Sequence, residues 1–181
     1  MKTNVKTAYL PRPIEFKLNL EFALLNQIEA MLQKRGVICI NPIRVSHKVG
    51  DDILHNQVYA ATLKREWRLK EFNEFMDGIW RINKESVDRS DIIVTAAETP
   101  AELEAVSGSG GTKREVERGI NQRKPCLLVC GCDSLEVINS HLLHSFTERG
   151  LEYGWAFKSI EQMVGWFNTY AQLPDEMPLN F

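Results

Sequence analysis

Short apolar runs alternate with amphipathic helical patterns along this chain, and the alternation limits the possible folds more than any other feature. Residues 91–94 and 126–130 form the most apolar runs, as is typical of central strands that are buried on both faces of a parallel sheet. Strands that alternate with helices form parallel sheets with helices on both sides. We therefore predict an α/β fold, a three-layer doubly wound sheet of the Rossmann or flavodoxin type, with about five parallel strands.

The other segments follow the same rhythm. Apolar residues at four-residue spacing predict a helix over residues 18–34, which Gly36 ends. Ser159, with Gln162 three residues later, has the spacing of a capping box at the start of a helix that reaches residue 170. We expect further strands at 5–10, 37–40 and 153–157, further helices at 53–75, 79–90, 112–122 and 135–149, and a loop at 97–111.

Length, charge and cysteine usage limit the class of protein. The 181 residues fit a single domain over 1–181, with a helical insertion at about 53–76. A net charge of −2 gives no reason to expect nucleic-acid binding, and no apolar run approaches the ~20 residues that span a membrane. Cysteines in strand-like runs suggest reduced thiols and a cytoplasmic location. Cys130 and Cys132 have the wrong spacing for a zinc pair, so we expect no metal and no cofactor.

A glycine-rich segment precedes the helix that carries Glu115. Glycines let a ligand approach the backbone closely, and the unpaired N–H groups at the start of a helix favour an anion. Glu115 falls in the first turn of the predicted helix, where its carboxylate could touch the sugar of a bound nucleotide. The segment comprises Gly108, Ser109, Gly110, Gly111 and Thr112.

The order of elements resembles that of the nucleoside 2-deoxyribosyltransferase-like superfamily, which includes nucleoside 5′-monophosphate N-glycosidases. The resemblance covers roughly residues 5–130 and is most specific around the glycine-rich segment. It implies cleavage or transfer of the N-glycosidic bond of a nucleoside or nucleotide. It gives Glu115 the role of a nucleophile that forms a glycosyl ester, and it gives Tyr9, at the end of the first strand, the role of orienting that glutamate.

The resemblance also implies how a phosphate and a second subunit would bind. Ser109 corresponds to a serine that contacts the phosphate in the monophosphate hydrolases, and the neighbouring glycines add neutral donors. Arg12 and Arg44 are further candidates for bidentate phosphate binding. Because members of the superfamily commonly form dimers or larger assemblies, we expect a homo-oligomer. The insertion at 53–76 carries more large apolar groups than one buried stripe requires.

One position departs from the pattern of the superfamily. An aspartate that exchanges a proton with the leaving base usually stands where this chain has Asn83. An amide can hydrogen-bond a base or a hydroxyl, but it cannot carry a proton. The same fold could therefore hold a nucleotide without turning it over, as a sensor or an assembly subunit.

Each candidate also has a plain structural explanation. Glu115 could be only a favourable charge near a helix N-terminus, and Tyr9 could be a core aromatic residue. Ser109 and Thr112 could be plain N-caps, and the glycine cluster could be a flexible surface loop. Three further candidates could simply be solvated surface residues: Asn83, Arg12 and Arg44.

Overall fold

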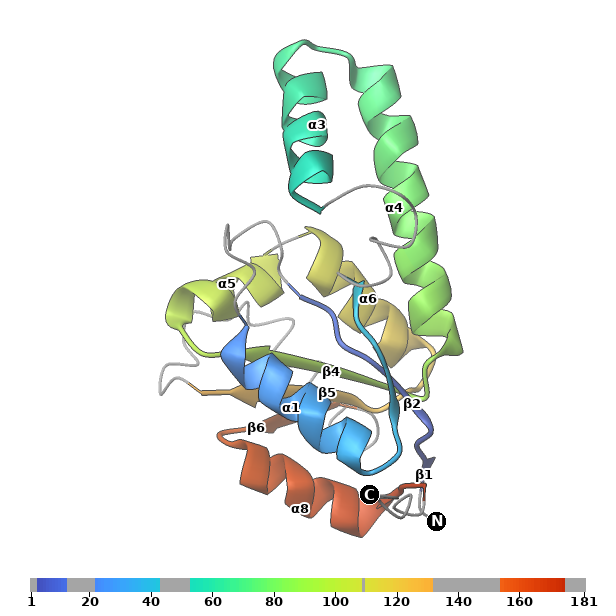
Figure 1. Ribbon diagram of the computed structural model, residues 1–181, viewed down its shortest axis with the longest axis vertical. Coiled ribbons are helices and arrows are strands. Elements are labelled where there is room, and N and C mark those ends of the chain that lie inside the picture. Colours follow the sequence, from blue (N-terminus) through green and yellow to red (C-terminus); the bar gives the residue numbers. More distant parts are fainter. Residues whose placement is uncertain (1–2, 13–21, 43–52, 109, 132–153, 175–181) are drawn as a thin grey trace, which may run out of the picture.

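The fold is built around one parallel sheet. The computed structural model describes residues 3–12, 22–42, 53–108, 110–131 and 154–174. All pairings in the five-stranded sheet are parallel, and helices flank it on both sides, which confirms the predicted three-layer α/β fold (Figure 1). In spatial order the strands are β3 (Ile38–Ile40), β2 (Thr7–Tyr9), β4 (Ile92–Ala97), β5 (Cys126–Cys130) and β6 (Gly154–Phe157).

The two most apolar strands lie inside the sheet, as their composition predicts. Every residue of β4 and β5 is buried. The register places Tyr9 beside Ile93 and Ile93 beside Cys126. Just before β4, Asp91 Oδ2 accepts hydrogen bonds from the backbone N–H groups of Lys6 and Thr7, at 2.9 and 2.8 Å. This carboxylate therefore joins β2 to β4 at their amino ends.

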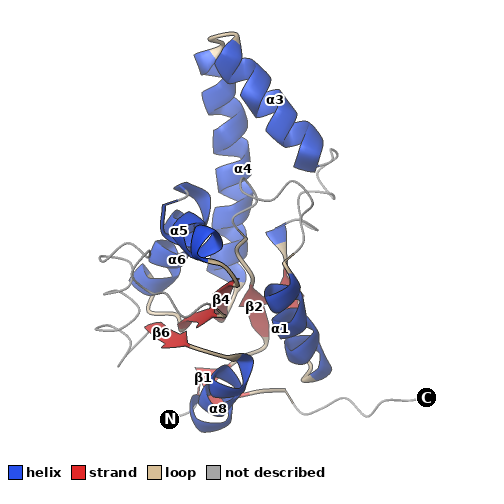
Figure 2. Cartoon of the chain, turned by 90° about the vertical axis from the view of Figure 1, so that its left-hand side faces the viewer, coloured by secondary structure: helices blue, strands red, loops and turns tan. Residues whose placement is uncertain are grey.

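Two hydrophobic clusters, one on each face of the sheet, pack the strands against the flanking helices. On one face, α1 (Ala23–Lys34) and α8 (Ile160–Tyr170) contribute Leu25, Ile28 and Phe167. On the other face the cluster takes residues from α4 (Leu69–Arg89), α5 (Pro100–Gly108) and α6 (Gly110–Asn121). Figure 2 shows these two groups of helices on opposite sides of the strands. The second cluster includes Tyr9, Val87, Leu103, Val116 and Ile120.

Two helices form a hairpin that extends beyond the sheet. They are α3 (Ile53–Arg65) and α4 (Leu69–Arg89), and only the C-terminal part of α4 reaches the core (Figure 1). The sequence predicts the break after residue 75, but it lies at 66–68. Trp67 there has a φ of 56° and donates its N–H to Lys64 O, while Arg68 N donates to Leu63 O. These paired bonds form a Schellman motif, which ends α3.

The expected loop at 97–111 is wrong, because most of it is α5. Thr99 Oγ1 accepts a hydrogen bond from Glu102 N at 3.2 Å, and the Glu102 carboxylate accepts one from Glu98 N at 2.7 Å. Pro100 occupies the first position of the helix, where its missing N–H has no cost. This local capping signal outweighs the lack of an apolar period.

The remaining expectations have mixed outcomes. Ser159 caps α8 by accepting from Gln162 N, and Gly36, with a φ of 76°, follows the end of α1, as predicted. The strand expected at 5–10 is β2, and a short strand before it that was not expected, β1 (Thr3–Asn4), pairs with β7 (Ala171–Gln172) outside the main sheet. The predicted helix at 135–149 lies outside the described residues. Within the described ranges, no helix is both long and apolar enough to cross a membrane.

Candidate active site

Glu115 is pressed against the sheet by the packing of its helix. The buried stripe of α6 comprises Thr112, Glu115, Val116, Gly119 and Ile120, a spacing that places one helix face on the strands. At Gly119 the approach is so close that a Cβ would lie 2.6 Å from Ile93 Cγ1 and 2.8 Å from Cys126 Sγ. A glycine is therefore needed there for α6 to sit at this depth. As a result, only 3% of Glu115 is exposed.

Two elements each bring a side chain to the Glu115 carboxylate or beside it. Asn83, from α4, donates Nδ2–H to Glu115 Oε1 at 2.7 Å. Tyr9, the last residue of β2, is fully buried and close enough to Glu115 for each to act on the other's pKa. The Tyr9 hydroxyl does not reach hydrogen-bond geometry with any described residue. The structure thus brings together the three residues that the resemblance marks as catalytic.

The electrostatics of this group differ from those of a surface carboxylate. Burial raises the pKa of Glu115 from 4.5 to about 7, and the neighbouring Asn83 and Tyr9 limit the rise because they favour the ionised form. Burial also raises the pKa of Tyr9 well above 10, and the charge of Glu115 adds to that rise. Tyr9 therefore keeps its proton, whereas Glu115 changes charge near neutral pH.

The position of this cluster in the fold is typical of a binding site. Strand β3 lies on one side of β2 within the sheet, and the next strand along the chain, β4, lies on the other side. The strand order therefore reverses between β2 and β4. In doubly wound sheets, ligands bind at such a reversal, beyond the carboxyl ends of the strands. Tyr9 ends β2 at that edge. Because α6 leads back to the amino end of β5, its start lies toward the carboxyl edge of the sheet.

The glycine-rich segment is the junction between two helices rather than an open loop. Gly108 ends α5, and Gly110 and Gly111 begin α6. Ser109 lies outside the described residues, so its contacts are not assigned. Thr112 is the third residue of α6 and therefore not its N-cap. A Cβ added at Gly111 would meet nothing within 4 Å, so this glycine is not required by packing.

Arg12 has a different environment from the solvated phosphate ligand that the sequence suggests. Its Nη2 lies 3.0 Å from Glu29 Oε2, and its Nη1 donates to Asn26 Oδ1 at 2.9 Å. The Arg12 and Glu29 side chains are only 3% and 4% exposed, and Asn41 also donates to Glu29. The guanidinium thus serves to join the end of β2 to α1. Arg44 lies outside the described residues.

The buried partner of Arg12 could have been noticed in the sequence. Glu29 follows Ile28 and lies between Leu25 and Leu32 on the apolar stripe of α1. A charged residue at such a position is rarely buried unless it is paired. The periodicity therefore signals that a basic partner must come from elsewhere, but it cannot say which one.

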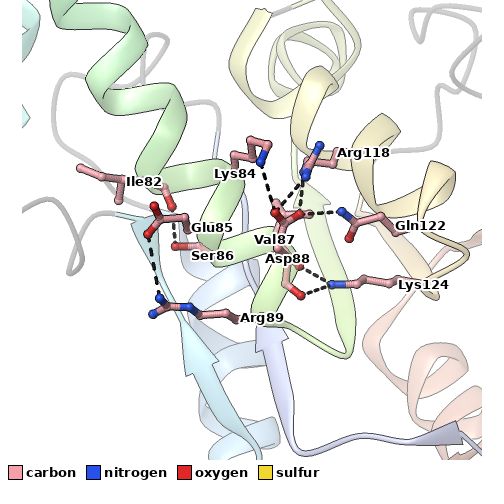
Figure 3. Close-up of polar contacts among 10 residues, drawn as sticks. All are labelled: Ile82, Lys84, Glu85, Ser86, Val87, Asp88, Arg89, Arg118, Gln122 and Lys124. Carbon is pink, nitrogen blue, oxygen red and sulfur yellow. Dashed lines mark hydrogen bonds and ion pairs between the residues drawn. The ribbon is translucent and has the colours of Figure 1, made fainter.

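A second polar cluster holds together the two helices that carry Asn83 and Glu115. Asp88, near the end of α4, accepts two hydrogen bonds from Arg118 of α6, at 2.7 and 2.8 Å, and a third from Gln122 (Figure 3). Lys124 Nζ donates to the carbonyl oxygens of Val87 and Asp88 at the same helix end. These contacts join α4 to α6 close to the Asn83–Glu115 contact, and so they support that contact.

Two other features of the described surface do not add to this site. A shallow hollow of about 260 Å³ lies over α4 and α6, and none of the side chains that line it belongs to the candidate site. Among the described residues, no cluster of His, Cys, Asp and Glu is arranged to hold a metal ion. The hollow is lined by Trp80, Arg114, Glu117, Arg118, Asn121 and Gln122.

Comparison with known proteins does not place the chain in a family. A scan against family models gives no match, and a search of curated proteins gives no significant similarity.

Proposed function

We propose that this protein cleaves or transfers the N-glycosidic bond of a nucleoside or nucleotide, with Glu115 as the nucleophile. The observation that carries the proposal is the hydrogen bond from Asn83 Nδ2 to Glu115 Oε1, with Tyr9 beside the same carboxylate. A carboxylate held by neutral partners at the strand-order reversal can be ionised and directed at a ligand without being neutralised by an ion pair.

The reaction needs one free carboxylate oxygen. Asn83 holds Oε1, which leaves Oε2 to attack the anomeric carbon, C1′, of the sugar. As the bond from Oε2 to C1′ forms, the C1′–N bond breaks, and its electron pair goes to the base nitrogen, which then takes up a proton from solvent. Water or a second base attacks C1′ of the glycosyl ester and restores the carboxylate, as in retaining glycosidases.

For a 5′-phosphate, we propose the start of α6 as the binding position. The first N–H groups of a helix have no partner within it and attract anions. Gly110 and Gly111 supply such groups, and the space around Gly111 is open. Ser109 remains a candidate on the basis of the resemblance alone. The superfamily-like arrangement thus makes nucleoside 5′-monophosphates the first ligands to test.

The second candidate function is a nucleotide-binding module without turnover. Asn83 favours it, because the amide that contacts Glu115 cannot give a proton to the leaving base. Tyr9 is close enough to act on the pKa of Glu115, but its own raised pKa makes it a poor acid at neutral pH. Turnover would therefore depend on solvent or on the nucleotide for that proton.

One experiment separates the two functions. The protein is incubated with a panel of nucleosides and nucleoside 5′-monophosphates, free base is measured by chromatography, and binding is followed by thermal shift. We expect base release that Glu115→Gln lowers by at least about a hundredfold, because an amide is a poor nucleophile. Glu117→Gln, on the exposed side of the same helix, is the control. A thermal shift without base release would support the binding module, and neither signal would contradict both functions.

We also propose that the protein forms a homodimer through the tip of the α3–α4 hairpin. Three of the most exposed apolar side chains lie on this hairpin: Val58 at 64%, Trp67 at 81% and Leu69 at 49%. Trp67 also occupies a position with φ of 56°, where glycine is the usual residue. A large aromatic group that is both strained and exposed suggests an interaction surface rather than a role in folding.

A further inference from the structure

Two buried hydroxyl groups beside Glu115 have no hydrogen-bond partner among the described residues. They are Thr112 Oγ1 and Tyr9 Oη, and the two residues are 2% and 0% exposed. Buried polar atoms are nearly always hydrogen-bonded, so each exception needs an explanation. A ligand that brings its own hydrogen-bonding group to this place would provide one.

The two hydroxyls belong to different elements that meet at Glu115. Thr112 precedes Glu115 by three residues on the buried stripe of α6, and residues at this spacing have Cβ atoms about 5–6 Å apart. Thr112 is nearer the start of the helix, and so nearer the carboxyl edge of the sheet. Tyr9 approaches the carboxylate from β2. Two hydroxyl-bearing residues therefore neighbour Glu115, one from its own helix and one from a strand.

We propose, on the basis of the glycosidic function above, that the sugar bound here is ribose and that the Thr112 and Tyr9 hydroxyls bind its 2′-hydroxyl. C2′ is the carbon next to C1′, the atom that Glu115 would attack, so its hydroxyl lies nearest to groups that flank the carboxylate. Tyr9 would donate its proton to this hydroxyl, and the hydroxyl would donate to Thr112 Oγ1.

Hydrogen bonds to the 2′-hydroxyl would affect both the reaction rate and the choice between ribose and deoxyribose. In retaining glycosidases, hydrogen bonds to the hydroxyl beside the anomeric carbon strengthen in the transition state. A site with buried polar groups that are placed for a ligand hydroxyl discriminates strongly against an analogue without it, because those groups are then left unpaired. With 2′-deoxyribose, Thr112 Oγ1 and Tyr9 Oη would keep the unpaired state that they have in the structure.

Two residues next to the cluster are less buried than Glu115. Asn83 is only half-buried, although it contacts the almost fully buried Glu115. Gly111, one residue before Thr112, is exposed, and a Cβ there would meet nothing within 4 Å. In this proposal, a sugar would reach the hydroxyls and the carboxylate from the side of these two residues.

The test compares matched ribo- and 2′-deoxyribonucleoside 5′-monophosphates, with binding measured by calorimetry and base release by chromatography. We expect the wild-type protein to bind the ribo member of a pair at least about tenfold more tightly. Thr112→Val should remove most of this preference, and Thr112→Ser, which keeps the hydroxyl, should retain it. Thr169→Val, on the exposed side of α8, is the matched control and should leave the preference unchanged.

The outcomes distinguish this inference from the proposed function. Equal binding of both members, tighter binding of the deoxy member, or a preference that survives Thr112→Val would overturn the ribose assignment only. A ribose preference without base release would support the assignment and contradict the glycosidic reaction. No binding of either series would overturn both. The melting temperature of ligand-free Thr112→Val gives a further check: a clear fall would show that the hydroxyl already has a partner in the protein.

Discussion

At the scale of single residues, Glu115 has a protonation state that depends on folding. Its pKa is about 7 in the folded protein and 4.5 when it is solvated. Between these values the folded state holds a proton that the unfolded state has lost. The stability from this proton is fully present below pH 4.5 and is lost as the pH rises through 7.

Glu115→Gln removes this pH dependence. Gln can still accept from Asn83 through its own Oε1, and it carries no charge at any pH. We expect the variant to match the wild type at pH 4 and to exceed its free energy of unfolding by about 3 kcal/mol at pH 8. Urea unfolding of both proteins across this range measures the difference. Glu117→Gln should follow the wild type, and a difference for Glu115→Gln that does not change with pH would contradict the buried titration.

At the scale of elements, the site depends on how α4 lies against α6. Asn83 and Glu115 join the two helices at the site, and Asp88 joins them again near the end of α4, where Arg118 and Gln122 hold its pKa well below the usual range (Figure 3). Because Asp88 and Arg118 are partly exposed, this second contact is screened by solvent. We therefore expect it to add only about 1 kcal/mol to the free energy of unfolding while it joins the two helices.

Asp88→Asn tests this role. We expect a loss of about 1 kcal/mol in the free energy of unfolding at pH 7, which shrinks as salt rises to about 1 M, because the charge on Asp88 is then screened. Glu85→Gln is the control, since Glu85 and Arg89 form only a long 4.0 Å pair within α4. Chemical denaturation at low and high salt gives both values. An effect no larger than that of Glu85→Gln would show that Asp88 does not fix the helix pair.

The elements also show which parts of the structure the sequence could predict. The limits of β5 and the Ser159 cap were predicted correctly, because an unbroken apolar run and a capping box are local signals. α5 was missed although Thr99 and Glu102 carry a local signal, because the glycines after it suggested a loop.

Local sequence signals predict less of the candidate site. Residue order and the resemblance marked Glu115, Asn83 and Tyr9, but their contacts join residues far apart in the chain, and no periodicity fixes such contacts. For the same reason, the burial of Arg12 against Glu29 could not be foreseen from either residue alone, and Arg12 was expected at the surface.

At the scale of the whole molecule, the three layers account for the core but leave the α3–α4 hairpin outside it (Figure 1). Some apolar groups of the hairpin pack within this chain: Leu63 is fully buried, and Tyr59 and Phe75 pack edge to face with ring centroids 5.1 Å apart. Only some of the apolar groups that suggest an oligomer are therefore available to a second subunit. Trp67 is the most exposed of them.

Trp67→Gly is the most direct test of the proposed dimer. Glycine adopts a positive φ without strain, so the variant should keep the Schellman turn and fold at least as stably as the wild type, while it loses the exposed aromatic group. We expect the wild-type protein to sediment as a dimer at low micromolar concentration and the variant to sediment as a monomer. Ile38→Glu, at an apolar side chain that is 65% exposed on the edge strand β3, should not change the wild-type result. A wild-type monomer would contradict the dimer itself. A dimer that survives Trp67→Gly but dissociates with Ile38→Glu would place the interface at the edge of the sheet, where two copies of β3 could pair, instead of at the hairpin.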